Sequence, residues 1–219
     1  MAKIEWDKTG ERYYETGVKN GVLYVKTAGA YGNGVAWNGL TAVTESPSGA
    51  EATPLYADDI KYLNLLSNEE FGATIEAYTY PEEFAACDGS AALAKGVMIG
   101  QQKRSTFGLC YRTALGNDED GVDHGYKLHI IYNCLAAPSE RAYTSINDSP
   151  EAITFSWEVT TTPEMVSGEG LKPTSCVTID STKVEEGVMA KLEAKLYGTE
   201  TEEPTLPTPD EIVALLAAG

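Results

Sequence analysis

The segment from Asp118 to His124 holds the side chains of this chain that could, by their types alone, bind a hard cation. They are Asp118, Glu119, Asp120, Asp123 and His124. Oxygen ligands suit Ca²⁺ and Mg²⁺, but the spacing does not follow the EF-hand loop. Asn, Asp and Gly are also the ordinary residues of tight turns. We therefore expect a hairpin turn at this segment and no bound metal.

Three pairs of adjacent carboxylates could in principle supply the acid and the base of a glycoside hydrolase. They are Asp58/Asp59, Glu69/Glu70 and Glu82/Glu83. That chemistry needs two carboxylates that converge in a cleft. Adjacent residues of a strand point instead to opposite faces of the sheet. We expect all three pairs to be solvated surface charge.

No other motif for catalysis or cofactor binding occurs in the sequence. The glycine-rich segment Ala28–Gly34 lacks the GxGxxG spacing, and no helix-forming run follows it, so a phosphate-binding loop is not predicted. There is no GxSxG motif. His129 alternates with Leu128 and Ile130 in a predicted strand, which indicates a packed or polar-face histidine. We predict no enzyme activity and no cofactor.

The cysteines are too far apart in the sequence to form a CxxC or Cys/His metal-binding motif. They are Cys87, Cys110, Cys134 and Cys176. Cys110 and Cys134 fall in predicted strands, where an unpaired cysteine behaves as a small buried apolar residue. We predict structural thiols, as is usual in a reducing compartment.

The chain is strongly acidic, with a formal net charge of −17 over 219 residues. A polyanion repels nucleic acid, because binding to phosphates needs clustered Lys and Arg. The segment Met1–Gly10 is polar and lacks the apolar core of a signal peptide. No run approaches the roughly 20 apolar residues of a membrane span. We expect a protein that is made and folded in a cytoplasm and has no membrane partner.

Strand-type runs separated by turn residues extend over most of the chain and predict a mainly β protein. The clearest alternation places Ile153, Phe155, Trp157 and Val159 on one face of a strand, and Thr154, Ser156, Glu158 and Thr160 on the other. Consecutive strands with turn-rich connections favour an antiparallel β-sandwich or barrel. The predicted strands cover residues 22–26, 35–44, 71–80, 105–114, 126–135, 153–162 and 176–180.

Three helices are predicted beside the strands. A short one begins at Pro81 and ends at Gly89, and an amphipathic one covers Val184–Tyr197. The segment Thr199–Pro209 is rich in Pro and Glu, which predicts an extended, mobile linker before a last apolar helix at 209–218. The predicted organisation is a β domain (1–183), a flanking helix (184–198) and a separate C-terminal helical tail (199–219).

A long acidic stretch separates two of the predicted strands. From Thr41 to Asp88 ten acidic residues stand against one basic residue, Lys61. Within it, Ser46–Asp59 carries Pro, Gly and Ser turn signals and is predicted to be a long loop, with a short strand near Leu55–Tyr56. Long loops in compact domains are commonly functional, so we expect a contact surface here.

Several blocks of the sequence are informative together. They are Trp37–Phe84, Phe107–Leu115 (FGLCYRTAL), Gly125–Asn133 (GYKLHIIYN), Ala137–Tyr143 (APSERAY) and Ser145–Thr162 (SINDSPEAITFSWEVTTT). The amino-acid sequence of these blocks resembles the phi13-type major tail (tail tube) proteins of long-tailed phages and prophages of Gram-positive bacteria. The resemblance covers most of residues 1–180 and has no single invariant signature.

This resemblance implies a tail-tube fold, a β-sandwich or barrel with a flanking helix. It implies rings, expected to be hexameric, that stack into a hollow tube in the virion, assembled in the host cytoplasm. DNA passes through the tube without being bound specifically. The implied partners are further copies of the chain and the tape measure, tail terminator, tail-tip and assembly chaperone proteins.

Two groups of residues are predicted to serve such a tube. Facing the lumen we expect Glu76, Thr154, Ser156, Glu158 and Thr160. Contacts between rings are expected from the N-terminal arm and from a loop that contains Ser46, Pro47, Glu51, Pro54, Tyr56, Asp58 and Asp59. An acidic lumen would let DNA slide, because it repels phosphate.

A carbohydrate-binding or adhesin-like β-sandwich is the alternative class. Its sugar platform would be formed by exposed aromatic side chains, for which the candidates are Tyr13, Tyr14, Tyr31 and Trp37. Such a module would stay monomeric and bind glycans, whereas a tube subunit would self-assemble.

Overall fold

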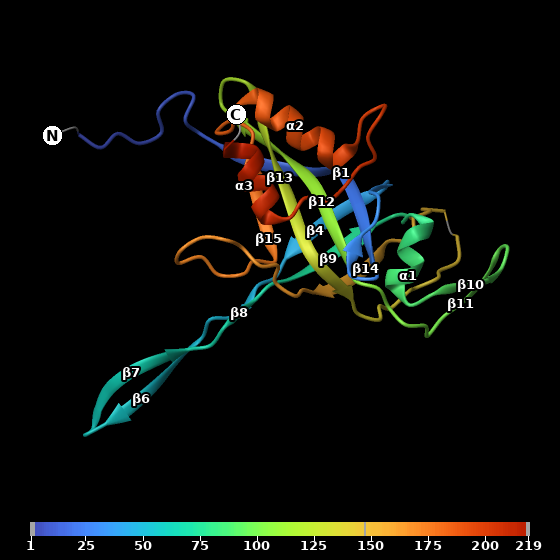
Figure 1. Cartoon of the computed structure of the whole chain (residues 1–219), viewed down its shortest axis with the longest axis horizontal. Coiled ribbons are helices and arrows are strands. Elements are labelled where there is room, and N and C mark those ends of the chain that lie inside the picture. The colour runs from blue at the N-terminus through green and yellow to red at the C-terminus, as the bar shows by residue number, and fades with distance from the viewer. Residues whose placement is uncertain (1–2, 147, 218–219) are drawn as a thin grey trace.

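The computed structural model describes residues 3–146 and 148–217, which form two packed antiparallel sheets with a helical layer on one side (Figure 1). The first sheet contains β1 (Tyr14–Thr27), β12 (Phe107–Asn117), β13 (Gly121–Ala136) and β15 (Cys176–Asp180), with the short strands β2 (Ala30–Tyr31) and β3 (Val35–Trp37) beside β1. The second sheet contains β4 (Leu40–Glu45), β9 (Gly72–Ala77) and β14 (Phe155–Thr160). The predicted fold class, mainly β and antiparallel, is confirmed.

Strand β13 joins the two sheets. Its middle pairs with β12 and β15, and its last residues, Leu135 and Ala136, pair with Thr160 and Val159 of β14. Between the sheets lies an apolar core of side chains from both, in which Leu109 and Ile131 meet Ile75 and Trp157. A sandwich core of this kind explains why alternate residues of β9 and β14 are buried.

The central strands of the first sheet, β12 and β13, are buried on both faces over much of their length. In β13, Ile131 belongs to the core between the sheets, whereas Ile130 and Tyr132 pack under the helices. The run of apolar residues in β13 follows from this, because a strand covered on both sides needs no polar face.

The helical layer consists of α2 (Glu186–Tyr197) and α3 (Pro209–Ala217), which cover the first sheet (Figure 1). The predicted apolar stripe of α2 is buried, at Val188, Leu192 and Leu196. The Tyr24 hydroxyl donates a hydrogen bond of 2.5 Å to the Leu196 carbonyl, which fixes the end of α2 on β1. The predicted last helix ends at Ala217, and Ala218 lies outside the described residues.

The prediction of a mobile, separate C-terminal tail is wrong for the described residues. Leu206, Pro207 and Pro209 are buried, and the Tyr132 hydroxyl donates to the Pro207 carbonyl over 2.9 Å. The Gly34 N–H donates to the Pro204 carbonyl over 2.8 Å. Prolines lack an N–H donor, but their carbonyls still accept, so a Pro-rich segment can be held against a sheet.

Replacement of Leu206 by Ala is expected to lower the free energy of unfolding by about 2–3 kcal/mol, since it empties a buried site between the first sheet and α3. Leu216→Ala is the matched control, because Leu216 is exposed on α3 and its loss is expected to cost under about 0.5 kcal/mol. Urea unfolding measures both. Equal, negligible effects would contradict a docked C-terminal segment.

Two hairpins leave the body of the molecule at different places (Figure 1). The first has a narrow base, β5 (Ser48–Gly49) paired with β8 (Glu69–Glu70), and a long outer part, β6 (Ala52–Ala57) paired with β7 (Ile60–Leu66). The second joins β10 (Ala91–Ala94) to β11 (Val97–Ile99) and follows a short helical segment, η1 (Glu82–Phe84) and α1 (Ala85–Asp88).

The predicted long loop at 46–59 is therefore one half of a β-hairpin. Its turn residues, Asp58 and Asp59, have φ values of 51° and 61°, the left-handed pair that closes a two-residue hairpin turn. The predicted helix after Pro81 is confirmed, and it ends at Gly89, whose φ of 78° is the usual left-handed helix stop.

Candidate functional site

Residues 118–120 form the turn between β12 and β13, which hydrogen bonds hold, and Asp123 and His124 lie at the start of β13. The Asn117 side-chain oxygen accepts from the N–H groups of Glu119 and Asp120, at 3.1 and 2.6 Å. Asp118 accepts from the Gly10 and Arg12 N–H groups. Desolvation acts to raise the pKa of Asp118, but these backbone bonds and the nearby Arg12 hold it below its ordinary value. Within residues 3–146 and 148–217, no group of three or more His, Cys, Asp or Glu side chains is arranged to hold a metal ion.

The carboxylate pairs and His129, the other residues considered for catalysis or binding, do not form a site in the fold. The three carboxylate pairs lie apart, at the β6–β7 turn, in β8 and in η1, and all six side chains are exposed. His129 stacks on Tyr111 with ring centroids 4.7 Å apart, and desolvation lowers its pKa although Glu15 and Glu45 act in the opposite sense.

All four cysteines are free, and Cys87, Cys110 and Cys134 are buried. Burial raises the pKa of Cys87 and of Cys110 to about 12 in each case. These thiols therefore stay protonated at neutral pH and are poor nucleophiles. The predicted structural role of the cysteines agrees with this geometry.

The four aromatic candidates for a sugar platform do not form one surface. Trp37 is only 3% exposed and packs against Phe84 and Trp157 in the core between the sheets. The Tyr31 hydroxyl is hydrogen-bonded to Asn133. Tyr13 and Tyr14 alone of the four are exposed, so the expectation of a four-residue platform is wrong.

The outer face of the second sheet is polar and acidic. Ser156 lies opposite Glu76 in the register, and Glu158 lies opposite Thr74. These four residues and Thr160 point away from the core, since their strand neighbours are the buried ones. We call this set the acidic face. The strands β4, β9 and β14 contain three Glu and no Lys, Arg or His.

Four of the five residues predicted to face a lumen therefore share one surface, on β9 and β14. Thr154 is exposed but precedes the start of β14 at Phe155, so it lies beside the acidic face and not within its strands. On one side of the second sheet, β4 pairs with β9 only. Its other edge therefore leaves backbone donors and acceptors open among the described residues, and such an edge can pair with another chain.

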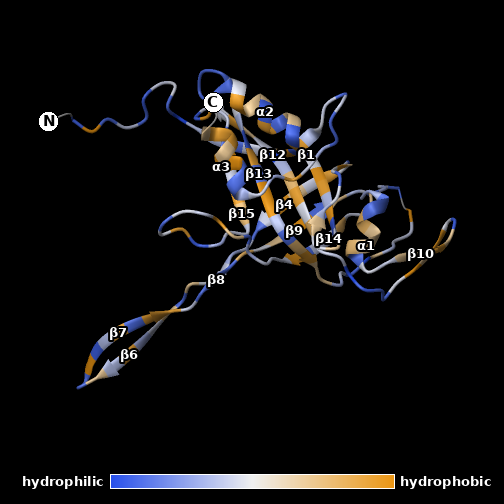
Figure 2. Ribbon diagram, viewed as in Figure 1, coloured by the Kyte–Doolittle hydropathy of each residue, from blue (hydrophilic) through white to orange (hydrophobic). Residues whose placement is uncertain are grey.

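The β6–β7 hairpin is a second unusual surface, because every residue of both strands is exposed. The register places Leu55 opposite Leu63, Thr53 opposite Leu65 and Ala57 opposite Ile60. Thr53, Leu55, Leu63 and Leu65 alternate with their strand neighbours, so they lie on one face of the hairpin, and a register shift between Leu55 and Tyr56 separates them from Ala57 and Ile60. We call this surface the apolar hairpin face. Apart from Thr53, it carries only aliphatic side chains. Figure 2 shows the hydrophobic residues of β7 outside the body of the molecule.

The predicted contact residues occupy only part of this hairpin. Ser46, Pro47 and Glu51 lie at its base, Pro54 and Tyr56 in β6, and Asp58 and Asp59 at its turn. The return strand, Ile60–Leu66, carries most of the exposed apolar side chains and was not among them. The available signal for this return strand was a turn of two aspartates followed by alternating leucines at 63 and 65.

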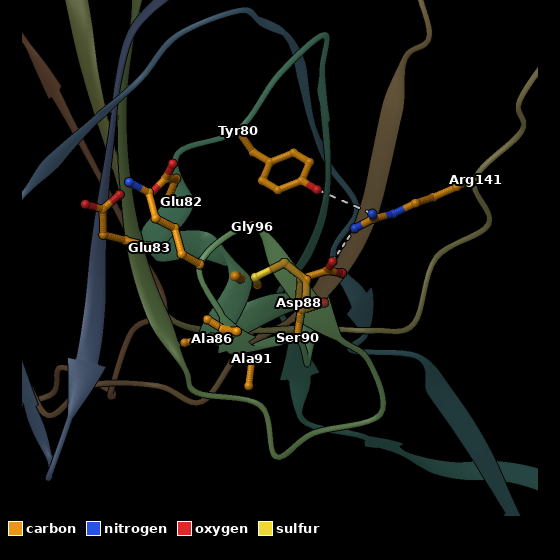
Figure 3. Close-up of a pocket in the computed structure, with 14 residues that line it drawn as sticks. Tyr80, Glu82, Glu83, Ala86, Asp88, Ser90, Ala91, Gly96 and Arg141 are labelled. Carbon is orange, nitrogen blue, oxygen red and sulfur yellow. Dashed lines mark hydrogen bonds and ion pairs between the residues drawn. The ribbon is translucent and has the colours of Figure 1, made fainter.

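A hollow of about 970 Å³ lies between α1 and the β10–β11 hairpin (Figure 3). Its lining is mostly small or apolar, and an ion pair between Arg141 and Asp88 stands on one side of it. Arg141 also donates to the Tyr80 hydroxyl over 3.3 Å, and the Trp157 indole N–H donates to Asp88 over 3.2 Å. This network ties that side of the hollow to Trp157 of β14.

Replacement of Arg141 by Ala is expected to cost about 3 kcal/mol of unfolding free energy. The change leaves the Asp88 side chain, 9% exposed, without its cation. The double variant Arg141→Ala/Asp88→Asn is the control and should recover most of the loss, because the Asn oxygen still accepts from Trp157. Chemical denaturation of both proteins checks this, and a double variant no better than Arg141→Ala would contradict it.

No helix among the described residues is long and apolar enough to cross a membrane.

Comparison with known proteins finds no matching family and no matching curated protein. Among solved structures, the chain is similar to a chain described as "Cryo-EM structure of the anti-feeding prophage (AFP) baseplate, 6-fold symmetrised". The identity is 8% and the TM-score 0.38, over 80% of this chain and 97% of that one. A TM-score of this size does not establish a common fold.

Proposed function

We propose that the chain is the structural subunit of a phage tail tube, a non-catalytic protein that self-assembles into stacked rings of six copies. The second sheet would line the tube, and the helices α2 and α3 would lie outside. DNA would pass through the lumen without being bound. The sequence resemblance described above supports this class of protein, and so do the surfaces of the fold.

The acidic face carries the proposal. It is a polar sheet surface with Glu76 and Glu158 and without a basic side chain on β4, β9 or β14. A wall of this kind repels phosphate, so that a duplex can slide instead of adhering. On the far side of the sandwich, α2 and α3 cover the first sheet, so the acidic face is the sheet surface left free.

The open edge of β4 and the apolar hairpin face supply the means of assembly. Pairing of β4 with a strand of the next copy would close the second sheets into a continuous barrel and remove the open edges. The hairpin extends away from the body (Figure 1) and would reach a copy in the next ring. Contacts between two different surfaces of the same chain generate rings where the rotation closes and polymers where it does not.

Electron microscopy of the purified chain at high concentration, together with its mass in solution, tests the proposal. We expect hollow tubes or six-membered rings. A reconstruction that places Glu76 and Glu158 on the outside of an assembly, or inside the protein, would overturn the lumen assignment. A chain that remains monomeric at every concentration and binds glycans would instead support the alternative class.

A further inference from the structure

The β10–β11 hairpin and its flanks form a basic segment in an acidic chain. Residues 90–106 contain Lys95, Lys103 and Arg104 and no acidic residue, whereas the whole chain has a net charge of −17. Lys95 and Lys103 are exposed, and neither has an ion-pair partner among the residues that the structure describes. Two exposed cations without partners are available to an acidic surface.

The same hairpin exposes apolar side chains beside a hollow. Leu93, Val97 and Met98 are exposed to 70, 48 and 54%. Of these three, Met98 lines the hollow of about 970 Å³, together with several alanines. Figure 3 shows Ala86 and Ala91 in its wall, with Glu82 and Glu83 on the side away from Arg141. Exposed apolar side chains beside a hollow lined largely by small residues suit a short row of aliphatic side chains from a partner.

The β6–β7 hairpin has the complementary properties. Residues 46–71 contain one cation, Lys61, and five acidic residues, Glu51, Asp58, Asp59, Glu69 and Glu70. Its apolar face offers Leu55, Leu63 and Leu65, all exposed, and Ile60 is exposed next to the turn. Acidic charge and aliphatic surface on this hairpin thus match basic charge and aliphatic surface on the other.

The two hairpins cannot meet within one molecule. Figure 1 shows β6–β7 and β10–β11 projecting from opposite sides of the body. A contact between them therefore joins two copies head to tail, and the pair still has one free hairpin of each kind, one on each copy. Such a contact propagates into a polymer.

We propose that the β6–β7 hairpin of one copy seats its apolar face on the β10–β11 hairpin of a second copy, over the hollow beside α1. The acidic turn at Asp58 and Asp59 lies near Lys95 and Lys103 of that copy. This inference rests on the proposed self-assembly and adds to it the surface that receives the hairpin.

A cysteine pair tests the contact in the full chain. The variant Leu63→Cys/Met98→Cys places one thiol on each surface, and we expect mild oxidation of its assemblies to give a ladder of covalent oligomers on a non-reducing gel. The control Leu63→Cys/Ala190→Cys moves the second thiol to the exposed side of α2 and should give no ladder beyond a dimer. Assemblies that form normally but give no ladder with the first variant would overturn the proposal.

Charge reversal tests the electrostatic part. Lys95→Glu/Lys103→Glu is expected to raise the concentration needed for assembly at least about tenfold, because like charges then face each other. Lys172→Glu/Lys191→Glu makes the same change of net charge at two other exposed lysines and should leave that concentration unchanged within about twofold. If the wild-type chain assembles and both variants assemble equally well, the docking surface is wrong and the tube proposal stands. If the wild-type chain does not assemble, the tube proposal itself fails.

Discussion

Removal of the β6–β7 hairpin is expected to abolish tube formation and to leave a folded monomer. Residues 50–68 would be replaced by Asn-Gly, which closes the β5–β8 base with a two-residue turn. Because every residue of β6 and β7 is exposed and belongs to neither apolar core, the midpoint of thermal unfolding should change by less than about 2 °C. Sedimentation and electron microscopy measure assembly, and calorimetry measures the fold.

A double substitution tests whether assembly needs the apolar hairpin face itself or only the presence of the hairpin. Leu63→Asp/Leu65→Asp removes two aliphatic side chains whose burial would contribute roughly 1.5–3 kcal/mol each. The concentration needed for assembly should therefore rise by about a hundredfold or more. Asn64→Asp is the control, since Asn64 lies on the other face of the same strand. Normal tubes from the deletion, or equal effects of Asn64→Asp and the leucine variant, would contradict an interface on this face.

Reversal of the lumen charge is expected to make the tube retain DNA. Glu76→Lys/Glu158→Lys puts two cations on the acidic face of every subunit, and each ring repeats them around the lumen. Short duplex DNA should then sediment with preformed variant tubes at low salt and dissociate steeply as salt rises, because phosphate contacts release counterions. Wild-type tubes should leave the DNA in solution.

The control must show that the position of the added positive charges, and not the change in net charge, causes DNA retention. Glu200→Lys/Glu203→Lys makes the same charge change at exposed residues between α2 and α3, on the helical side of the sandwich. Its tubes should sediment little DNA, because an exterior patch does not enclose the duplex. Equal retention by the two variants would show that net charge alone decides, and no retention by Glu76→Lys/Glu158→Lys would contradict the lumen assignment.

Local sequence patterns predicted much of the sheet structure. The alternation from Phe155 to Thr160 placed Trp157 and Val159 in the core and Ser156 and Glu158 outside, which the register with β9 confirms. The stripe of α2 and the stop at Gly89 were also predictable, because they depend on residues within a few positions of one another. The acidic face was thus visible in the sequence as a pattern, although its strand partner was not.

The two hairpins could not be predicted from the sequence, because their local signals are weak. The sequence of β10–β11 is short and rich in alanine, which has a low strand propensity, and no strand was predicted there. In the other hairpin, composition indicated a loop up to Asp59 and did not assign Ile60–Leu66 to a return strand. The apolar hairpin face exists only once β6 and β7 pair, because pairing brings Leu55 opposite Leu63.

The sequence by itself determined the class of the protein: an acidic, mainly β chain without a catalytic motif, with one strand whose outer face is polar. The tertiary structure alone decided which distant residues meet. Asp88 finds Arg141 and Trp157, and the Pro-rich segment around Leu206 is held by Tyr132 and Gly34. Composition predicted mobility for that segment because it records only local preference, whereas burial against a sheet depends on surfaces formed by strands far away in the chain.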